Sequence, residues 1–128
     1  MKRQAGLWID HREAIAVLMD NGEDETRRIE SGIEKHVRFS GGNQPEDGLA
    51  EDARDRQFAS HLTRYYDDVI SNIRDVESIL IFGPGEAKGE FAKRLTAKGF
   101  DGRIVDVETV DKMTPRQIAA KVRKHFQK

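Results

Sequence analysis

The chain has 128 residues, of which 37% are hydrophobic and 35% are charged, with no cysteine and a formal net charge of -1. This length predicts a single domain over residues 1–128, built around one core. The near-neutral charge excludes a protein that binds nucleic acid through overall basicity, so any such contact must come from a local patch. The lack of cysteine excludes disulfides, thiolate metal sites and a cysteine nucleophile.

The N-terminal region contains no pattern typical of a signal peptide or a membrane span. Its apolar run covers only residues 14–19 and follows the polar residues 10–13. A membrane span needs about 20 apolar residues, and a signal peptide has a different arrangement of charge and small residues. We therefore expect a cytoplasmic protein without membrane contact.

The first part of the chain is typical of an antiparallel meander. Residues 6–11 predict a strand, and the apolar run 14–19 predicts a second strand covered on both faces. The Asn-Gly pair at 21–22 is a strong hairpin signal, since both residues tolerate positive φ. A third strand is expected over 26–39, where apolar and polar residues alternate in the second half and Gly32 indicates a bulge.

A loop and a long helix are predicted next. Residues 40–49 are rich in glycine and polar side chains, which is typical of a mobile loop. Residues 50–74 have apolar side chains at helical spacing, which predicts an amphipathic helix. Its buried stripe is expected to contain Phe58, Leu62, Tyr65, Tyr66, Val69, Ile70 and Ile73.

The remainder predicts strand, helix, strand and helix. Residues 78–82 form an unbroken apolar strand, and a Gly-Pro-Gly turn leads from it into a helix over 86–98. Residues 103–107 predict the next strand. Thr114 followed by Pro115 marks the start of the last helix, because threonine caps helices and proline suits their first position.

This order of elements predicts an α/β fold of the ribonuclease-H-like class. An antiparallel meander of three strands is followed by strand, helix, strand and helix, and such connections produce parallel pairing with right-handed crossovers. We expect a mixed five-stranded sheet with strand order 3-2-1-4-5 and helices packed on it.

The turn after the fourth strand is a candidate phosphate-binding site. Gly83, Pro84 and Gly85 precede a helix, whose first N–H groups and positive dipole end can hold an anion, and Lys88 lies in its first turn. The turn has neither the Lys-Ser/Thr of a Walker loop nor the spacing of a dinucleotide motif. A tight turn with a purely structural role is the alternative.

The expected topology places Asp10 beside this turn, where a metal-dependent nuclease would hold its first aspartate. The fourth strand ends in Phe82-Gly83-Pro84-Gly85 and offers no second carboxylate, so a role of Asp10 with Arg12 in the hairpin turn is favoured. The four histidines lack metal-ligand spacing, and His125 is expected at the edge of the core. We predict no metal, no cofactor and no catalytic residue.

Basic residues are concentrated in the last helix. From Lys112 onward there are six basic residues and no acidic residue. Arg116 and Arg123 are expected on the face opposite Ile118 and Val122, where they and Lys124 could contact phosphates. The alternative is an ordinary solvated helix face.

The segment 78–91, with the sequence SILIFGPGEAKGEF, resembles the central domain of Pelota and of archaeal and eukaryotic class-1 peptide-chain release factors. In that family an apolar strand meets a Gly-Pro-Gly turn, followed by a lysine and an acidic-Phe pair. The long helix, the opening hairpin and the helical C-terminus occur in the same order, so the resemblance covers essentially the whole chain. It implies a translation-associated module that contacts the ribosome or tRNA and is not an enzyme.

Release factors carry a Gly-Gly-Gln motif between the third strand and the long helix. This chain has Gly41, Gly42, Asn43 and Gln44 at that place. Hydrolysis depends on the position of a backbone N–H and a glutamine around the attacking water, and the inserted Asn43 displaces both. The resemblance therefore implies RNA contact here without release activity.

The leading hypothesis is thus a non-catalytic module that binds ribosomal RNA or tRNA. The residues expected to contact RNA are Gly41, Gly42, Gln44, Gly83, Pro84, Gly85, Lys88, Arg116, Arg123 and Lys124. Three alternatives remain: a degenerate peptidyl-tRNA hydrolase that uses the 41–44 loop, a metal-dependent nuclease centred on Asp10, and a domain that binds a protein partner. The sequence leaves the oligomeric state open.

Overall fold

The computed structural model of the chain describes residues 3–20, 23–32 and 48–126, without the side chains of residues 48–57 and 101. The described residues form one five-stranded sheet with the order β3-β2-β1-β4-β5, which confirms the predicted order. Its strands are β1 (Gln4–Ile9), β2 (Glu13–Asp20), β3 (Glu23–Glu30), β4 (Ser78–Gly83) and β5 (Ile104–Thr109).

The directions of the strands are those expected from the sequence. β1 is antiparallel to β2 and parallel to β4, so that Leu7 lies opposite Ile81 and Trp8 lies opposite Phe82. β4 and β5 are also parallel. The carboxyl ends of β1, β4 and β5 therefore lie at the same end of the sheet.

The third strand differs from its prediction. β3 begins at Glu23, directly after the hairpin, and ends at Glu30. Gly32 follows with a φ of 69°, so it lies beyond the strand and not in a bulge within it. Residues 33–39 of the predicted strand, and most of the predicted 40–49 loop, lie outside the described residues. β3 is an outer strand rich in charged residues, which is one way in which edge strands avoid unwanted pairing.

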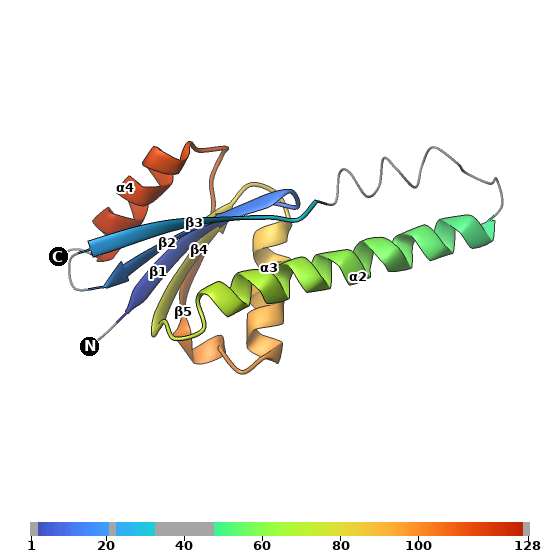
Figure 1. Cartoon of the computed structure of the whole chain (residues 1–128), viewed down its shortest axis with the longest axis horizontal. Coiled ribbons are helices and arrows are strands. Elements are labelled where there is room, and N and C mark those ends of the chain that lie inside the picture. Colours follow the sequence, from blue (N-terminus) through green and yellow to red (C-terminus); the bar gives the residue numbers. More distant parts are fainter. Residues whose placement is uncertain (1–2, 21–22, 33–47, 127–128) are drawn as a thin grey trace.

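The helices cover the two faces of the sheet. They are α2 (Gly48–Asn72), α3 (Ala87–Ala97) and α4 (Pro115–Phe126), and a short 3-10 turn, η1 (Asp101–Arg103), precedes β5. α2 and α3 lie on one face and α4 lies on the other, and the first half of α2 extends past the end of the sheet (Figure 1). α2 has 25 residues, but neither it nor any other helix in the described part of the chain is apolar enough to cross a membrane.

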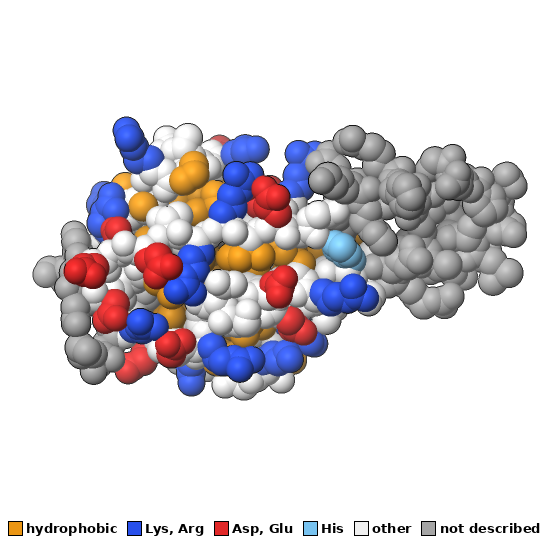
Figure 2. All heavy atoms as spheres, viewed as in Figure 1, with side chains coloured by type: hydrophobic (Ala, Val, Ile, Leu, Met, Phe, Trp, Pro, Cys, Tyr) orange, Lys and Arg blue, Asp and Glu red, His pale blue; other side chains and the backbone are white. Residues whose placement is uncertain are grey.

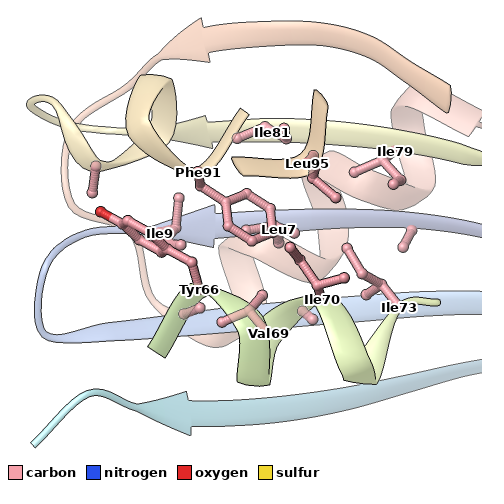
Figure 3. Packing of buried hydrophobic residues seen from close by; sticks show 14 of the residues in the cluster. Leu7, Ile9, Tyr66, Val69, Ile70, Ile73, Ile79, Ile81, Phe91 and Leu95 are labelled. Carbon is pink, nitrogen blue, oxygen red and sulfur yellow. The ribbon is translucent and has the colours of Figure 1, made fainter. Parts of the chain in front are cut away.

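Two hydrophobic clusters occupy the two faces. The larger one joins the sheet to α2 and α3, and Figure 3 shows Tyr66, Val69 and Ile70 of α2 beside Leu7 and Phe91. In the smaller one, Ile118 and Val122 of α4 pack against Trp8, Phe82 and their neighbours. Full burial of one such side chain contributes about 1.5–3 kcal/mol. The stripe predicted for the long helix is buried from Leu62 to Ile73, and Phe58 at its start is half-buried.

Two glycines permit close approach between elements. A Cβ atom on Gly6 of β1 would lie 2.4 Å from Cγ2 of Val122, so glycine lets α4 lie directly on the strand. A Cβ atom on Gly83 would lie 2.3 Å from the carbonyl oxygen of Ile9. The contact at Gly6 determines how closely α4 packs on the sheet. The contact at Gly83 determines how closely the end of β4 approaches β1.

The predicted helix boundaries are confirmed to within about two residues. Thr114 and Gln117 form a capping box, since the Gln117 N–H donates to Thr114 Oγ1 at 3.2 Å and the Thr114 N–H donates to Gln117 Oε1 at 2.9 Å. Gly99 follows α3 with a φ of 91°, as expected for a glycine that ends a helix.

Candidate functional site

The carboxyl ends of β1, β4 and β5 meet the starts of α3 and α4 at one end of the sheet (Figure 1). We refer to residues 10–12, 83–88 and 110–116 as the carboxyl edge. The Val110 N–H donates to the Gly83 carbonyl at 3.0 Å, and the indole N–H of Trp8 donates to the Asp111 carbonyl at 3.2 Å. The first bond holds the segment before α4 against the Gly-Pro-Gly turn, and the second holds it against β1.

Asp10 closes the turn between β1 and β2. Its Oδ1 atom accepts the N–H groups of Arg12 at 2.8 Å and Glu13 at 2.9 Å. Its carbonyl accepts the hydroxyl of Tyr65 at 2.9 Å, and burial raises the pKa of that hydroxyl. The favoured role of Asp10 in the hairpin turn is confirmed. The residues that the structure describes contain no group of three or more His, Asp or Glu side chains that could hold a metal ion.

Lys88 bends back over the Gly-Pro-Gly turn. Its ammonium group donates to the Gly85 carbonyl, and Gly85 has a φ of 63°, which favours glycine. Beside the turn is a hollow of about 430 Å³ between the start of α3 and β5. It is lined by Gly85, Glu86, Lys88, Gly89, Glu90, Lys93 and Val107.

A hydrogen-bonded group that the sequence analysis missed lies next to this hollow. Oε1 of Glu90, in the first turn of α3, is 3.0 Å from Nε2 of His11 and 2.7 Å from the hydroxyl of Tyr66, which donates to it. Burial alone would raise the pKa of Glu90, but the hydrogen bonds from Tyr66 and His11 outweigh it and hold that pKa below its ordinary range. The sequence signal was the position of His11 just after β1 and of Glu90 at the start of the helix after β4, since β1 and β4 are neighbouring strands.

The structure separates the predicted basic residues into two groups. Arg116 is exposed in the first turn of α4, at the carboxyl edge. Arg123 forms an ion pair with Asp24 at 2.8 Å, and Asp24 lies near the start of β3, at the opposite end of the sheet. Lys124 is eight residues beyond Arg116, about 12 Å along the helix. His125 is exposed, with its ring against Phe126, so the expectation that it lies at the core edge is wrong.

Gly83, Pro84, Gly85, Lys88 and Arg116 therefore share one end of the sheet, whereas Arg123 and Lys124 lie at the other end. Gly41, Gly42 and Gln44 lie outside the described residues.

Two cations of the carboxyl edge form no ion pair with any other residue that the structure describes. Within the described ranges, Lys112 and Arg116 form no salt bridge, whereas Arg94 is bound to Asp67 at 2.8 Å and Lys121 to Glu108 at 2.8 Å. The charge of Lys93 acts on the Glu90 carboxylate and helps to lower its pKa. Over the face shown in Figure 2, acidic and basic side chains are interspersed and form no continuous basic field. Any attraction of this edge for an anion must therefore come from its individual cations and helix starts, and not from a broad positive surface.

Comparison with known proteins gives matches at the level of structure. No protein-family model and no curated protein matches the sequence. The Pelota protein of Thermoplasma acidophilum matches with a TM-score of 0.61 and 17% identity, over 96% of this chain and 32% of that chain. The chain has the fold of one part of Pelota.

Two further structures agree with this assignment of the fold. The archaeal translation termination factor aRF1 matches with a TM-score of 0.59 and 12% identity, over 98% of this chain and 35% of that chain. Pelota of Archaeoglobus fulgidus matches with a TM-score of 0.59 and 13% identity, over 97% of this chain and 31% of that chain. The chain thus spans about a third of the length of these Pelota and aRF1 proteins.

Proposed function

We propose that the protein is a non-catalytic, translation-associated module that contacts ribosomal RNA or tRNA through its carboxyl edge. The observation that carries the proposal is the bond between Val110 and Gly83, because it joins the Gly-Pro-Gly turn to the segment that bears Lys112 and Arg116. The shared fold with an archaeal translation termination factor supports a role in translation. Such a role places the protein in the cytoplasm, with the ribosome or tRNA as its partner.

The charges of this edge are suited to phosphate contacts. Lys112 and Arg116 form no salt bridge with another described residue, so they can reach a phosphate without breaking one, and the Lys88 ammonium group donates to the Gly85 carbonyl. The starts of α3 and α4 add N–H groups and positive dipole ends at the same place. Since each neutralised phosphate releases counterions, binding of this kind weakens steeply as the salt concentration rises.

Co-sedimentation with ribosomes over a series of salt concentrations tests the proposal. We expect the intact protein to pellet with ribosomes at low salt and to dissociate as salt rises. The triple substitution Lys88→Ala, Lys112→Ala and Arg116→Ala should lower the slope of log affinity against log salt by about 2–3, roughly one for each lost phosphate contact. Circular dichroism would confirm that this variant keeps its fold.

The matched control removes cations from the other end of the sheet. Arg123→Ala with Lys124→Ala should leave the salt slope nearly unchanged, because these residues lie away from the carboxyl edge. Equal losses in both variants would point to non-specific attraction, and a protein that stays in the supernatant at low salt would overturn the proposal.

The same preparations distinguish the enzymatic alternatives. Peptide release from peptidyl-tRNA that Gln44→Ala abolishes would make the protein a hydrolase. Magnesium-dependent RNA cleavage that Asp10→Asn abolishes would make it a nuclease, although Asp10 Oδ1 already accepts two backbone N–H groups. We expect neither activity.

A further inference from the structure

β5 is an outer strand of the sheet, with no neighbour beyond it among the described residues. It differs from the other outer strand, β3, whose sequence is EDETRRIE. The large hydrophobic side chains that are exposed in the described part of the chain are both on β5: Val105 at 47% and Val107 at 38%. Apolar side chains on an unpaired edge strand are the feature that natural sheets normally avoid.

The free side of β5 is occupied by one of its own side chains. The Val107 N–H donates to Oδ1 of Asp106 at 2.9 Å, so this N–H is not used in the ladder with β4. The Asp106 carboxylate has no ion-pair partner within the described ranges. A cation that attracted this carboxylate would free the Val107 N–H for pairing with another strand.

The two faces of β5 have different chemistry. Asp106 lies opposite Leu80, whose side chain is in the cluster under α4. Val107 lies opposite Ile81, whose side chain is in the cluster under α2 and α3, and it lines the hollow of about 430 Å³ at the start of α3. A strand added next to β5 would therefore meet a carboxylate on one face and an apolar side chain beside an open hollow on the other.

We propose that β5 binds an extended segment of a partner protein as a sixth strand of the sheet. In this segment a lysine or arginine lies beside Asp106, and an apolar residue lies beside Val107 and enters the hollow. Backbone hydrogen bonds supply the affinity, and the alternation of basic and apolar residues supplies the specificity. Asp106 and Val107 lie outside the carboxyl edge, but the hollow beside Val107 shares Gly85 and Lys88 with the proposed RNA contacts, so this surface is tested without RNA.

The charges of β5 argue against a second copy of this chain as the occupant. An antiparallel pair of β5 strands that places Val105 opposite Val107 also places Asp106 opposite Asp106 of the second copy. An antiparallel pair in which Val107 lies opposite Val107 of the second copy places Asp106 opposite Glu108 of that copy. Like charges directly opposite each other destabilise a sheet, so both registers are unfavourable.

Titration with synthetic peptides tests the proposal, using the intact protein without RNA. The probe is a fluorescent ten-residue peptide of alternating valine and lysine. Its controls are the same peptide with N-methylated backbone nitrogens, a peptide of the same composition with valines and lysines in separate blocks, and a peptide of alternating valine and glutamate. We expect binding of the alternating lysine peptide and at least about tenfold weaker binding of the N-methylated one, because it cannot form the ladder.

The variant Asp106→Lys supplies the matched charge test. The Asp106 side chain is exposed on the strand surface, so the fold should persist. The substitution should weaken binding of the lysine peptide and strengthen binding of the glutamate peptide, each by roughly threefold, the size of one cross-strand charge pair. Amide NMR spectra should show the largest shifts at β5.

The proposal is overturned if the N-methylated or block peptide binds as well as the alternating one. It is also overturned if Asp106→Lys leaves the preference between the lysine and glutamate peptides unchanged. Concentration-dependent dimerisation of the protein that the N-methylated peptide leaves intact and the alternating peptide blocks would show that a second copy, and not a partner segment, occupies β5.

Discussion

The carboxylate of Glu90 accepts a hydrogen bond from the hydroxyl of Tyr66 at 2.7 Å, and the same oxygen is 3.0 Å from Nε2 of His11. The three side chains come from α3, α2 and the turn after β1, so one carboxylate joins both helices of this face to the end of the sheet. Burial raises the pKa of Tyr66, and its bond to Glu90 raises it further, so the phenol remains a donor at neutral pH.

We predict that Glu90→Gln makes the stability of the protein less dependent on pH in acid, below the ordinary pKa of a glutamate, 4.5. Because the folded-state pKa of Glu90 is lowered, its contribution to stability is complete above its ordinary, unfolded pKa of 4.5 and is lost as the pH falls through the lower folded value. At pH 7 the substitution should cost about 1 kcal/mol or less, since the Glu90 side chain is 40% exposed and solvent screens it. Urea unfolding at a series of pH values measures both effects.

Tyr66→Phe is the companion to that variant. It removes one of the two donors that lower the pKa of Glu90, so the loss of stability in acid should be smaller, and should be complete at a higher pH, than in the unsubstituted protein. A pH profile identical to that of the unsubstituted protein would show that the Tyr66 bond does not hold Glu90 in its ionised form.

Gly6→Ala should destabilise the protein by about 1–3 kcal/mol, because the new methyl group would overlap Cγ2 of Val122 at 2.4 Å. Val122→Ala removes that atom, so the double variant should be more stable than the sum of the two single changes by about 1 kcal/mol or more. Urea unfolding of the unsubstituted protein, the two single variants and the double variant measures this coupling energy. Simple additivity would mean that α4 moves away from β1 without cost.

Gly83→Ala and Gly89→Ala should act in opposite directions. A methyl group on Gly83 would lie 2.3 Å from the Ile9 carbonyl oxygen, a backbone atom in a central strand, and we expect a loss of about 3 kcal/mol or more. Gly89 lies within α3 and has nothing within 4 Å of such a group, so alanine should stabilise the helix by about 0.5 kcal/mol. Thermal unfolding should show a lower Tm for the first variant and a slightly higher one for the second.

Thr114→Ala should cost about 1 kcal/mol, because it removes the hydroxyl that accepts the Gln117 N–H at the start of α4. Thr114→Ser retains a hydroxyl at the same position and should stay within about 0.5 kcal/mol of the unsubstituted protein. Comparable losses in both variants would indicate that the methyl group of Thr114, and not its hydrogen bond, holds this end of the helix.

Strands buried on both faces, and helices with one apolar stripe, were predictable from the sequence. β2 and β4 were recognised by unbroken apolar runs, and α2 and α4 were recognised by helical periodicity. β3 was predicted with the wrong limits because most of its side chains are exposed at the edge of the sheet, where no core face imposes a clear pattern. The candidate site was predicted in part, since the Gly-Pro-Gly turn and Arg116 share one end of the sheet.

The sequence by itself determined the order of elements, the strand order and the starts of α3 and α4, because apolar spacing, glycine turns and capping residues act over a few neighbouring positions. Only the tertiary structure decided which polar groups meet. His11 and Glu90 are 79 positions apart, and Arg123 and Asp24 are 99 apart. Such contacts depend on how far each helix is rotated and shifted on the sheet. Packing against Gly6, Gly83 and the two hydrophobic clusters fixes that placement, and no local stretch of sequence encodes it.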